Sequence, residues 1–104
     1  MSRCRSCEPV TAEVRVAADL LGRRWLLQVI VAAHSGALRF NEFGSAVVGI
    51  SPRMLASRLR DLERAGLVER AVIPDSPPRV EYCLTERGEA LGPLVEALRR
   101  YAAA

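Results

Sequence analysis

The stretch "GISPRMLASRLRDLERAGLVER", Gly49 to Arg70, decides the fold of this chain of 104 residues. Ser51 is a favourable helix N-cap and Pro52 suits the first helical position, so a helix is expected to begin here. Three leucines follow at helical spacing, at positions 55, 59 and 62, and Gly66 suits the left-handed residue that ends a helix. The stretch therefore predicts an amphipathic helix over about residues 52–65.

The arginines of this helix differ in their expected roles. At about 100° per residue, Arg53, Ser57, Arg60 and Arg64 fall opposite the leucines. Arg58 lies on the flank, where it would reach a phosphate or support the helix. An outward face of this kind is either a solvated surface or a surface for a polyanion, and the helix alone leaves both interpretations open.

The segments beside the helix complete a recognisable pattern. A short helix that carries Phe40 and Phe43 inward and a turn over residues 47–49 precede it, which together predict a helix-turn-helix. Residues 67–73 and 79–84 alternate apolar and polar side chains around the loop "PDSPP", which predicts a β-hairpin. The expected fold is therefore α+β, mainly α: a winged helix-turn-helix whose wing is this hairpin.

Further helices flank this unit. Thr11 is expected to cap a first helix that Gly22 closes, and "RRWLLQVIVAAHSG" predicts a second helix, apolar on nearly every side and hence the most buried. Thr85 is expected to cap one final helix that ends with Arg99 and Arg100, an order that suits the helix dipole.

Length and composition indicate one domain. Residues 1–10 are predicted to be a flexible tail and residues 11–104 the domain. All 15 basic residues are arginine, whose planar guanidinium suits phosphate or guanine, but a net charge of +3 decides nothing alone. Neither a membrane-spanning apolar run nor a signal peptide is visible, so the expected location is the cytoplasm and no membrane partner is predicted.

Cys4 and Cys7 form a C-x-x-C pair that leaves three interpretations open. It is an incidental pair of thiols in a tail, a redox pair favoured by neighbouring arginines, or half of a zinc site. Zinc would need more ligands, and Cys83 and His34 are more typical of a buried apolar residue and of a helix end. We therefore predict candidate redox residues but no metal and no cofactor. No nucleophile with a partner base is visible, so no enzyme is predicted.

A winged helix-turn-helix places the outward face of its second helix in the major groove. Arginine bridges guanine, and serine and methionine can touch a thymine methyl, while arginines of the wing contact flanking phosphates. The predicted DNA-binding residues are Arg39, Asn41, Ser51, Pro52, Arg53, Met54, Ser57, Arg58, Arg70 and Arg79.

About four-fifths of the chain resembles the HxlR-type winged-helix transcriptional regulators of bacteria, which are relatives of the MarR group. The fragments that carry the resemblance are "LLGRRWLLQVI", "RFNEF", "GISPRMLASRLRDLERAGLVER", "PPRVEYCLTERG" and "LGPLVEALRRY". The resemblance implies a homodimeric repressor that binds a palindromic operator on double-stranded DNA, with dimerisation helices at both ends of the chain. By that reading the dimer interface includes Val14, Ala18, Leu21, Leu91, Leu94, Leu98 and Tyr101.

Two alternatives stand beside this reading. The apolar stripes of the terminal helices would otherwise complete a monomer core, and the whole chain would otherwise be a dimeric protein-interaction module that does not bind DNA. The sequence also departs from the family, whose members often carry a sensing cysteine followed by proline near the start of the first helix. Here that position falls near Ala12, whereas Cys7 lies about five residues earlier and precedes Glu8. The sequence does not reveal whether a small-molecule effector exists.

Overall fold

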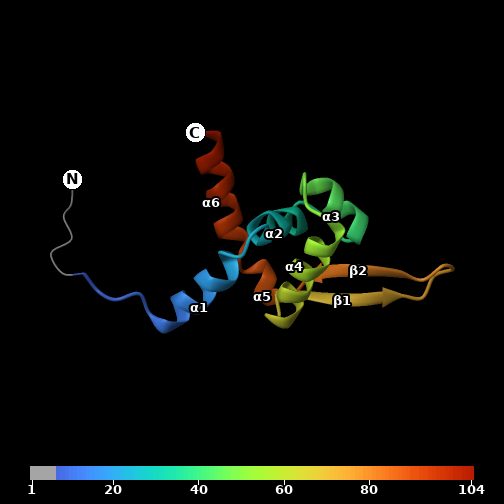
Figure 1. The fold of residues 1–104 in the computed structure, drawn as a ribbon, viewed down its shortest axis with the longest axis horizontal. Coiled ribbons are helices and arrows are strands. Elements are labelled where there is room, and N and C mark those ends of the chain that lie inside the picture. Colours follow the sequence, from blue (N-terminus) through green and yellow to red (C-terminus); the bar gives the residue numbers. More distant parts are fainter. Residues whose placement is uncertain (1–6) are drawn as a thin grey trace.

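The computed structural model describes residues 7–104 and confirms the winged helix-turn-helix (Figure 1). Its elements, in chain order, are α1 (Ala12–Leu21), α2 (Leu26–His34), α3 (Phe40–Ala46), α4 (Pro52–Arg64), β1 (Val68–Ile73), β2 (Arg79–Leu84), α5 (Glu86–Glu89) and α6 (Gly92–Ala103). Figure 1 shows α2, α3 and α4 gathered at the centre, with α1, α6 and the hairpin extending away from them. None of these helices is both long and apolar enough to cross a bilayer.

Helix α4 forms as its sequence predicts. The hydroxyl of Ser51 accepts a hydrogen bond of 3.1 Å from the backbone N–H of Met54, and Pro52 occupies the first turn. Leu55, Leu59 and Leu62 are buried, so one face of the helix is fixed against the core. Each fully buried leucine contributes about 1.5–3 kcal/mol, which is enough to hold the opposite face in one orientation.

The hairpin also lies where the sequence predicts it. β1 and β2 pair antiparallel from Val68 opposite Leu84 to Ile73 opposite Arg79. Pro77 and Pro78 lie in the connecting loop, where their missing N–H groups cost no ladder hydrogen bond. Phe43 of α3 meets Tyr82 of β2 edge to face, with ring centroids 6.2 Å apart, and so joins the hairpin to the helices.

Helix α2 is the central helix, but it begins later than predicted. Its buried residues are Leu26, Val29, Ile30, Ala32 and Ala33. The predicted helical start at the arginines is wrong because Trp25 adopts a left-handed backbone conformation with φ of 75°, which interrupts the helical hydrogen bonds. Residues 22–25 instead form a tight connection between α1 and α2.

The single final helix predicted from Thr85 is wrong, since the structure divides it into α5 and α6. Thr85 does cap α5, by accepting a hydrogen bond of 3.1 Å from the N–H of Gly88. Pro93 explains the break, because it has no N–H for the carbonyl of Glu89 and its ring would collide with that carbonyl in a continuous helix. In the structure Pro93 lies in the first turn of α6, where a missing donor costs nothing.

Candidate nucleic-acid interface

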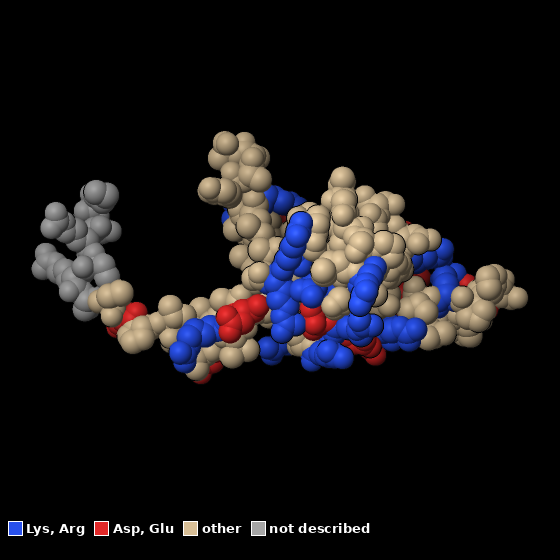
Figure 2. All heavy atoms as spheres, viewed as in Figure 1, with Lys and Arg blue, Asp and Glu red and all other residues tan. Residues whose placement is uncertain are grey.

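The outward face of α4 is open to solvent at its N-terminal end. Ser51, Pro52 and Arg53 are exposed, whereas Met54 and Ser57 are partly covered. Arg60 and Arg64 are exposed further along the same helix. Figure 2 shows arginines gathered over this side of the molecule, with few carboxylates among them. The geometry therefore presents a basic helix face with small polar groups at its beginning.

Arg58, predicted either to reach a phosphate or to support the helix, lies in a supporting position. Its Nε is 3.4 Å from Oδ2 of Asp61, and both atoms are shielded from solvent although they make no well-aligned hydrogen bond. The other oxygen of Asp61 is 2.8 Å from Nη1 of Arg23, in the connection before α2. Asp61 thus joins α4 to the connection between α1 and α2. The contact of Arg58 with DNA stays a prediction.

The wing arginines differ in their surroundings. Arg79 is bracketed by two carboxylates, since it pairs with Asp75 and its Nε lies 3.3 Å from Oε2 of Glu81. Arg70 is exposed on β1, opposite Tyr82, and has no carboxylate partner within residues 7–104. A DNA phosphate would have to compete with Asp75 and Glu81 for Arg79, whereas no described carboxylate competes for Arg70.

The start of α3 carries the two remaining predicted contacts. Arg39 and Asn41 are both exposed there. Oε1 of Glu42 accepts hydrogen bonds from the backbone N–H of Arg39 at 2.8 Å and of Leu38 at 2.9 Å. These bonds, with a smaller contribution from the charge of Arg39, hold the pKa of Glu42 below its ordinary value of 4.5. Glu42 therefore stays ionised and fixes the approach of the chain to α3.

Arg24 was missed by the sequence reasoning. Its guanidinium carbon lies 5.1 Å from the ring centroid of Trp25, which is a cation–π arrangement, and the side chain is exposed. An arginine directly before a tryptophan was the available signal in the sequence. This dipeptide does not predict where either side chain points, because no sequence pattern indicates the left-handed backbone conformation of Trp25.

None of the predicted dimer residues is buried within the chain. Val14, Leu94 and Tyr101 keep 55%, 38% and 83% of their surface exposed, and Leu21 and Leu98 are partly covered. Helix α1 has no buried residue at all. Leu21 and Leu91 nevertheless pack against the core, so the stripes complete the monomer core in part and the dimer interface stays a prediction.

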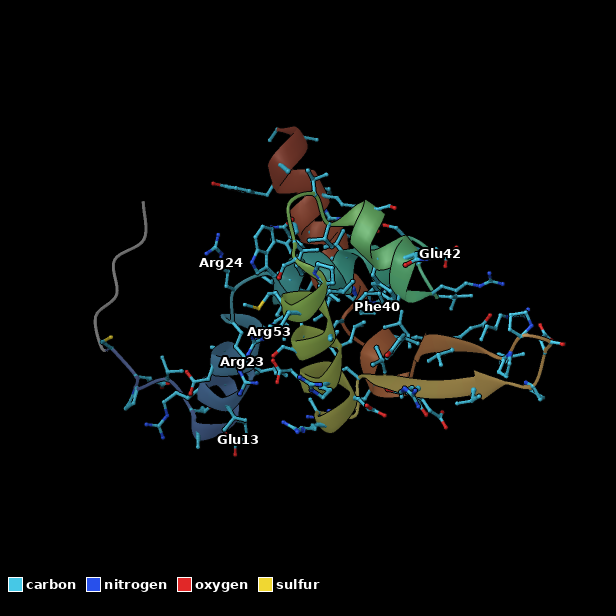
Figure 3. The ribbon with its side chains drawn as sticks, turned by 45° about the vertical axis from the view of Figure 1, so that its right-hand side comes forward. Glu13, Arg23, Arg24, Phe40, Glu42 and Arg53 are labelled. Carbon is cyan, nitrogen blue, oxygen red and sulfur yellow. The ribbon has the colours of Figure 1, made fainter. Side chains whose placement is uncertain are left out.

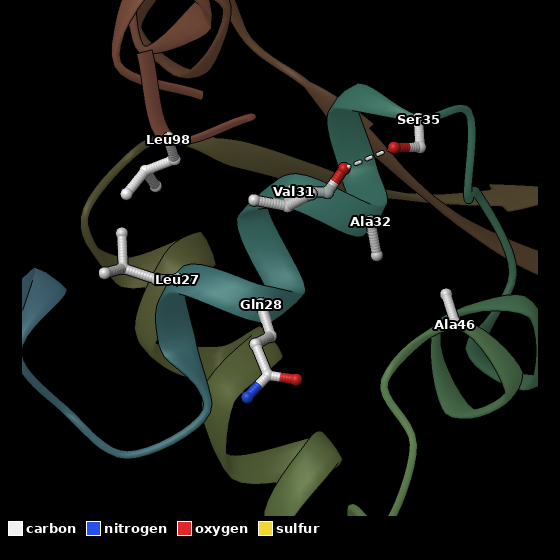
Figure 4. A pocket seen from close by; sticks show the side chains of 7 residues that line it. All are labelled: Leu27, Gln28, Val31, Ala32, Ser35, Ala46 and Leu98. Carbon is white, nitrogen blue, oxygen red and sulfur yellow. Dashed lines mark hydrogen bonds between the residues drawn. The ribbon is translucent and has the colours of Figure 1, made fainter. Parts of the chain in front are cut away.

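A hollow of about 360 Å³ lies between α2, α3 and α6 (Figure 4). It is lined by Leu27, Gln28, Val31, Ala32, Ser35, Ala46 and Leu98. The hydroxyl of Ser35 donates to the carbonyl of Val31 at 2.9 Å, and Arg99 of α6 donates to the same hydroxyl at 2.8 Å. The lining is mostly apolar and holds no ionisable group, so the hollow suits apolar contacts.

The described cysteines and the histidine form no metal-binding group within residues 7–104. Cys7 is exposed and Cys83 is partly covered in β2, while Cys4 lies outside the described residues. Nε2 of His34 is 3.1 Å from the carbonyl of Gly88, so it donates there and ties α2 to α5. Within residues 7–104 no three potential ligands gather around one point where a metal ion could bind.

Comparison with known proteins agrees with this architecture. The family described as HxlR-like helix-turn-helix matches residues 20–104. An uncharacterized HTH-type transcriptional regulator of Methanothermobacter thermautotrophicus is 45% identical over 85 residues, which are 82% of this chain and 65% of that protein. The HTH-type transcriptional regulator YodB of Bacillus subtilis is 41% identical over 84 residues, which are 81% of this chain and 75% of YodB.

Two solved structures extend the similarity to the fold. The reduced form of YodB from B. subtilis superposes with a TM-score of 0.79 at 37% identity, covering 90% of this chain and 92% of that one. The redox regulator HypR in its oxidized form gives a TM-score of 0.80 at 37% identity, covering 88% of this chain and 95% of that one. The chain therefore belongs to the HxlR-like helix-turn-helix family and is a transcriptional regulator of the helix-turn-helix type.

Proposed function

We propose that this protein is a homodimeric repressor that binds a palindromic operator on double-stranded DNA, with α4 in the major groove. The observation that carries the proposal is the division of α4 into two faces. Three buried leucines fix one face, and the exposed beginning of the helix presents Ser51 and Arg53 outward. Arg53 would bridge a guanine, and the wing would lie along the adjacent backbone.

The dimer is supported by the apolar surface of the terminal helices. Val14 and Val16 of α1 and Tyr101 of α6 are exposed, although apolar side chains of this size are normally covered. The hollow beside Leu98 adds further apolar surface next to α6. A two-fold dimer would place two copies of α4 about one DNA turn, roughly 34 Å, or a multiple of it apart.

The test compares Arg53→Ala, Arg79→Ala and the parent on DNA from upstream of the protein's own coding sequence, by fluorescence titration at several salt concentrations. Arg53→Ala should weaken binding by about 1–3 kcal/mol and relax specificity at one base position. Arg79→Ala should weaken binding to all sequences and make its salt dependence shallower by about one contact per subunit. Parental binding by both variants would refute the placement of α4.

The alternative function is that of a dimeric protein-interaction module that does not bind DNA. Absence of any mobility shift with the upstream region and with mixed-sequence duplexes would favour that module. A dimer that shifts the upstream region at lower concentration than mixed-sequence DNA would exclude it.

A redox response is supported by the exposed thiol of Cys7 and by the similarity to the redox regulator HypR. Diamide removes two electrons and two protons from a pair of thiols and leaves a disulfide, for which Cys7 would use Cys4 or a second subunit. Diamide should lower the affinity for DNA, and Cys7→Ser should abolish this loss. Unchanged affinity after treatment would remove the redox response from the proposal.

A further inference from the structure

Arg24 is a cation that lies against an aromatic ring and has no carboxylate partner within residues 7–104. The Trp25 ring lies 5.1 Å from the Arg24 guanidinium carbon. A cation–π contact at an exposed site contributes about 0.5–1 kcal/mol and leaves the positive charge unpaired. The contact therefore favours a position of the Arg24 side chain beside Trp25 before any ligand arrives.

Trp25 connects this cation to α4. The indole reaches the turn between α3 and α4, where a Cβ at Gly49 would lie 3.6 Å from Cη2 of Trp25. Gly49 precedes the N-cap Ser51 by two residues. Figure 3 draws Arg24 and Arg53 on the same flank of α4. The guanidinium of Arg24 is thus carried beside the beginning of the helix that the proposed function places in the major groove.

Arg24 differs in charge balance from Arg23, the residue before it. In the part of the chain that the structure describes, Arg23, Arg58, Arg79 and Arg99 each pair with a carboxylate. Arg24 has no such partner there and shares this property with Arg53, Arg60 and Arg64 of α4. An uncompensated guanidinium attracts a phosphate more strongly than one that is already paired.

We propose that Arg24, positioned by Trp25, donates to a DNA backbone phosphate beside the groove that α4 occupies. This inference rests on the proposed function and adds to it a backbone contact from the connection between α1 and α2. Phosphate contacts of this kind set the register of a protein on the duplex without reading its sequence.

The test titrates a fluorescent mixed-sequence DNA duplex three helical turns long with the full chain, at several salt concentrations. Arg24→Ala should weaken binding by about tenfold. It should also lower the slope of log affinity against log salt by about one per subunit. Arg100→Ala is the matched control, because it removes one exposed arginine from α6, away from α4, and should keep the parental slope. Sedimentation at the same concentrations checks that each variant keeps the parental assembly.

Arg24→Lys separates a phosphate contact from a structural role. It keeps the charge and should therefore restore most of the salt slope, while the loss of the planar stacking group reduces the affinity. Parental affinity and slope for Arg24→Ala would overturn the inference and leave the proposed function intact. A parent that binds no duplex would overturn both.

Discussion

At the scale of single residues, Gly88 is a position where the backbone leaves no room for a side chain. A Cβ there would lie 2.0 Å from the carbonyl oxygen of Leu67. Because that neighbour is backbone, it cannot rotate away. The missing side chain lets α5 lie directly on the start of the hairpin, where Thr85 also donates from its N–H to the carbonyl of Leu67 at 3.0 Å.

We therefore expect Gly88→Ala to lower the free energy of unfolding by at least about 2 kcal/mol. Gly44 is the matched control, since it is also helical and its Cβ would meet only Leu55 Cδ2, at 3.8 Å. Gly44→Ala should be neutral or stabilising by up to about 1 kcal/mol, because alanine favours the helix. Urea unfolding monitored by circular dichroism measures both changes, and equal changes would contradict the steric account.

At the scale of elements, Asp61 ties α4 to the connection between α1 and α2. Its side chain is only 11% exposed and lies between the guanidinium groups of Arg58 and Arg23. The Arg58 side chain is 16% exposed, so its charge is poorly hydrated without Asp61. The ion pairs of Asp61 thus hold α4, the helix that carries most of the candidate DNA contacts, against the connection between α1 and α2.

Asp61→Asn should lower the free energy of unfolding by about 2 kcal/mol, between the values for exposed and fully buried pairs. The control is Glu96→Gln, which breaks the surface pair of Glu96 with Arg99 and should cost no more than about 1 kcal/mol. Unfolding in urea at low and high salt provides the measurement. A cost for Asp61→Asn no larger than for Glu96→Gln would show that burial of the pair is unimportant.

At the scale of the whole molecule, α1 and α6 extend away from the central helices (Figure 1). Several of their apolar side chains are exposed. Val14 is exposed within the chain, so a charge there should not disturb the fold of one subunit. Within a dimer interface the same charge would be buried without a partner. A substitution on the exposed face of α1 should therefore change dimerisation without changing the stability of the single subunit.

We expect the parent to sediment as a dimer and Val14→Glu as a folded monomer with an unchanged circular dichroism spectrum. Asp19→Asn changes an exposed charge on the same helix and should remain a dimer. Sedimentation velocity at several protein concentrations distinguishes the species. A monomeric parent, or a dimeric Val14→Glu variant, would contradict the proposed interface.

The sequence by itself determined the parts of this protein that depend on local chemistry. Ser51 and Pro52 set where α4 begins, its leucine spacing set the buried face, and the proline loop set the hairpin. Such signals act within a few residues, so periodicity and capping suffice to find them. Most of the candidate DNA-binding face follows from that one helix.

Only the tertiary structure decided which charges remain free and which segments meet. Asp61 forms an ion pair with Arg58, and Asp75 and Glu81 form ion pairs with Arg79. Arg24 follows α1 next to the left-handed residue Trp25 and has no carboxylate partner within residues 7–104. The exposure of α1 likewise appears only in the assembled chain. The physical reason is distance along the chain, because charge pairing and burial depend on neighbours that local patterns do not contain.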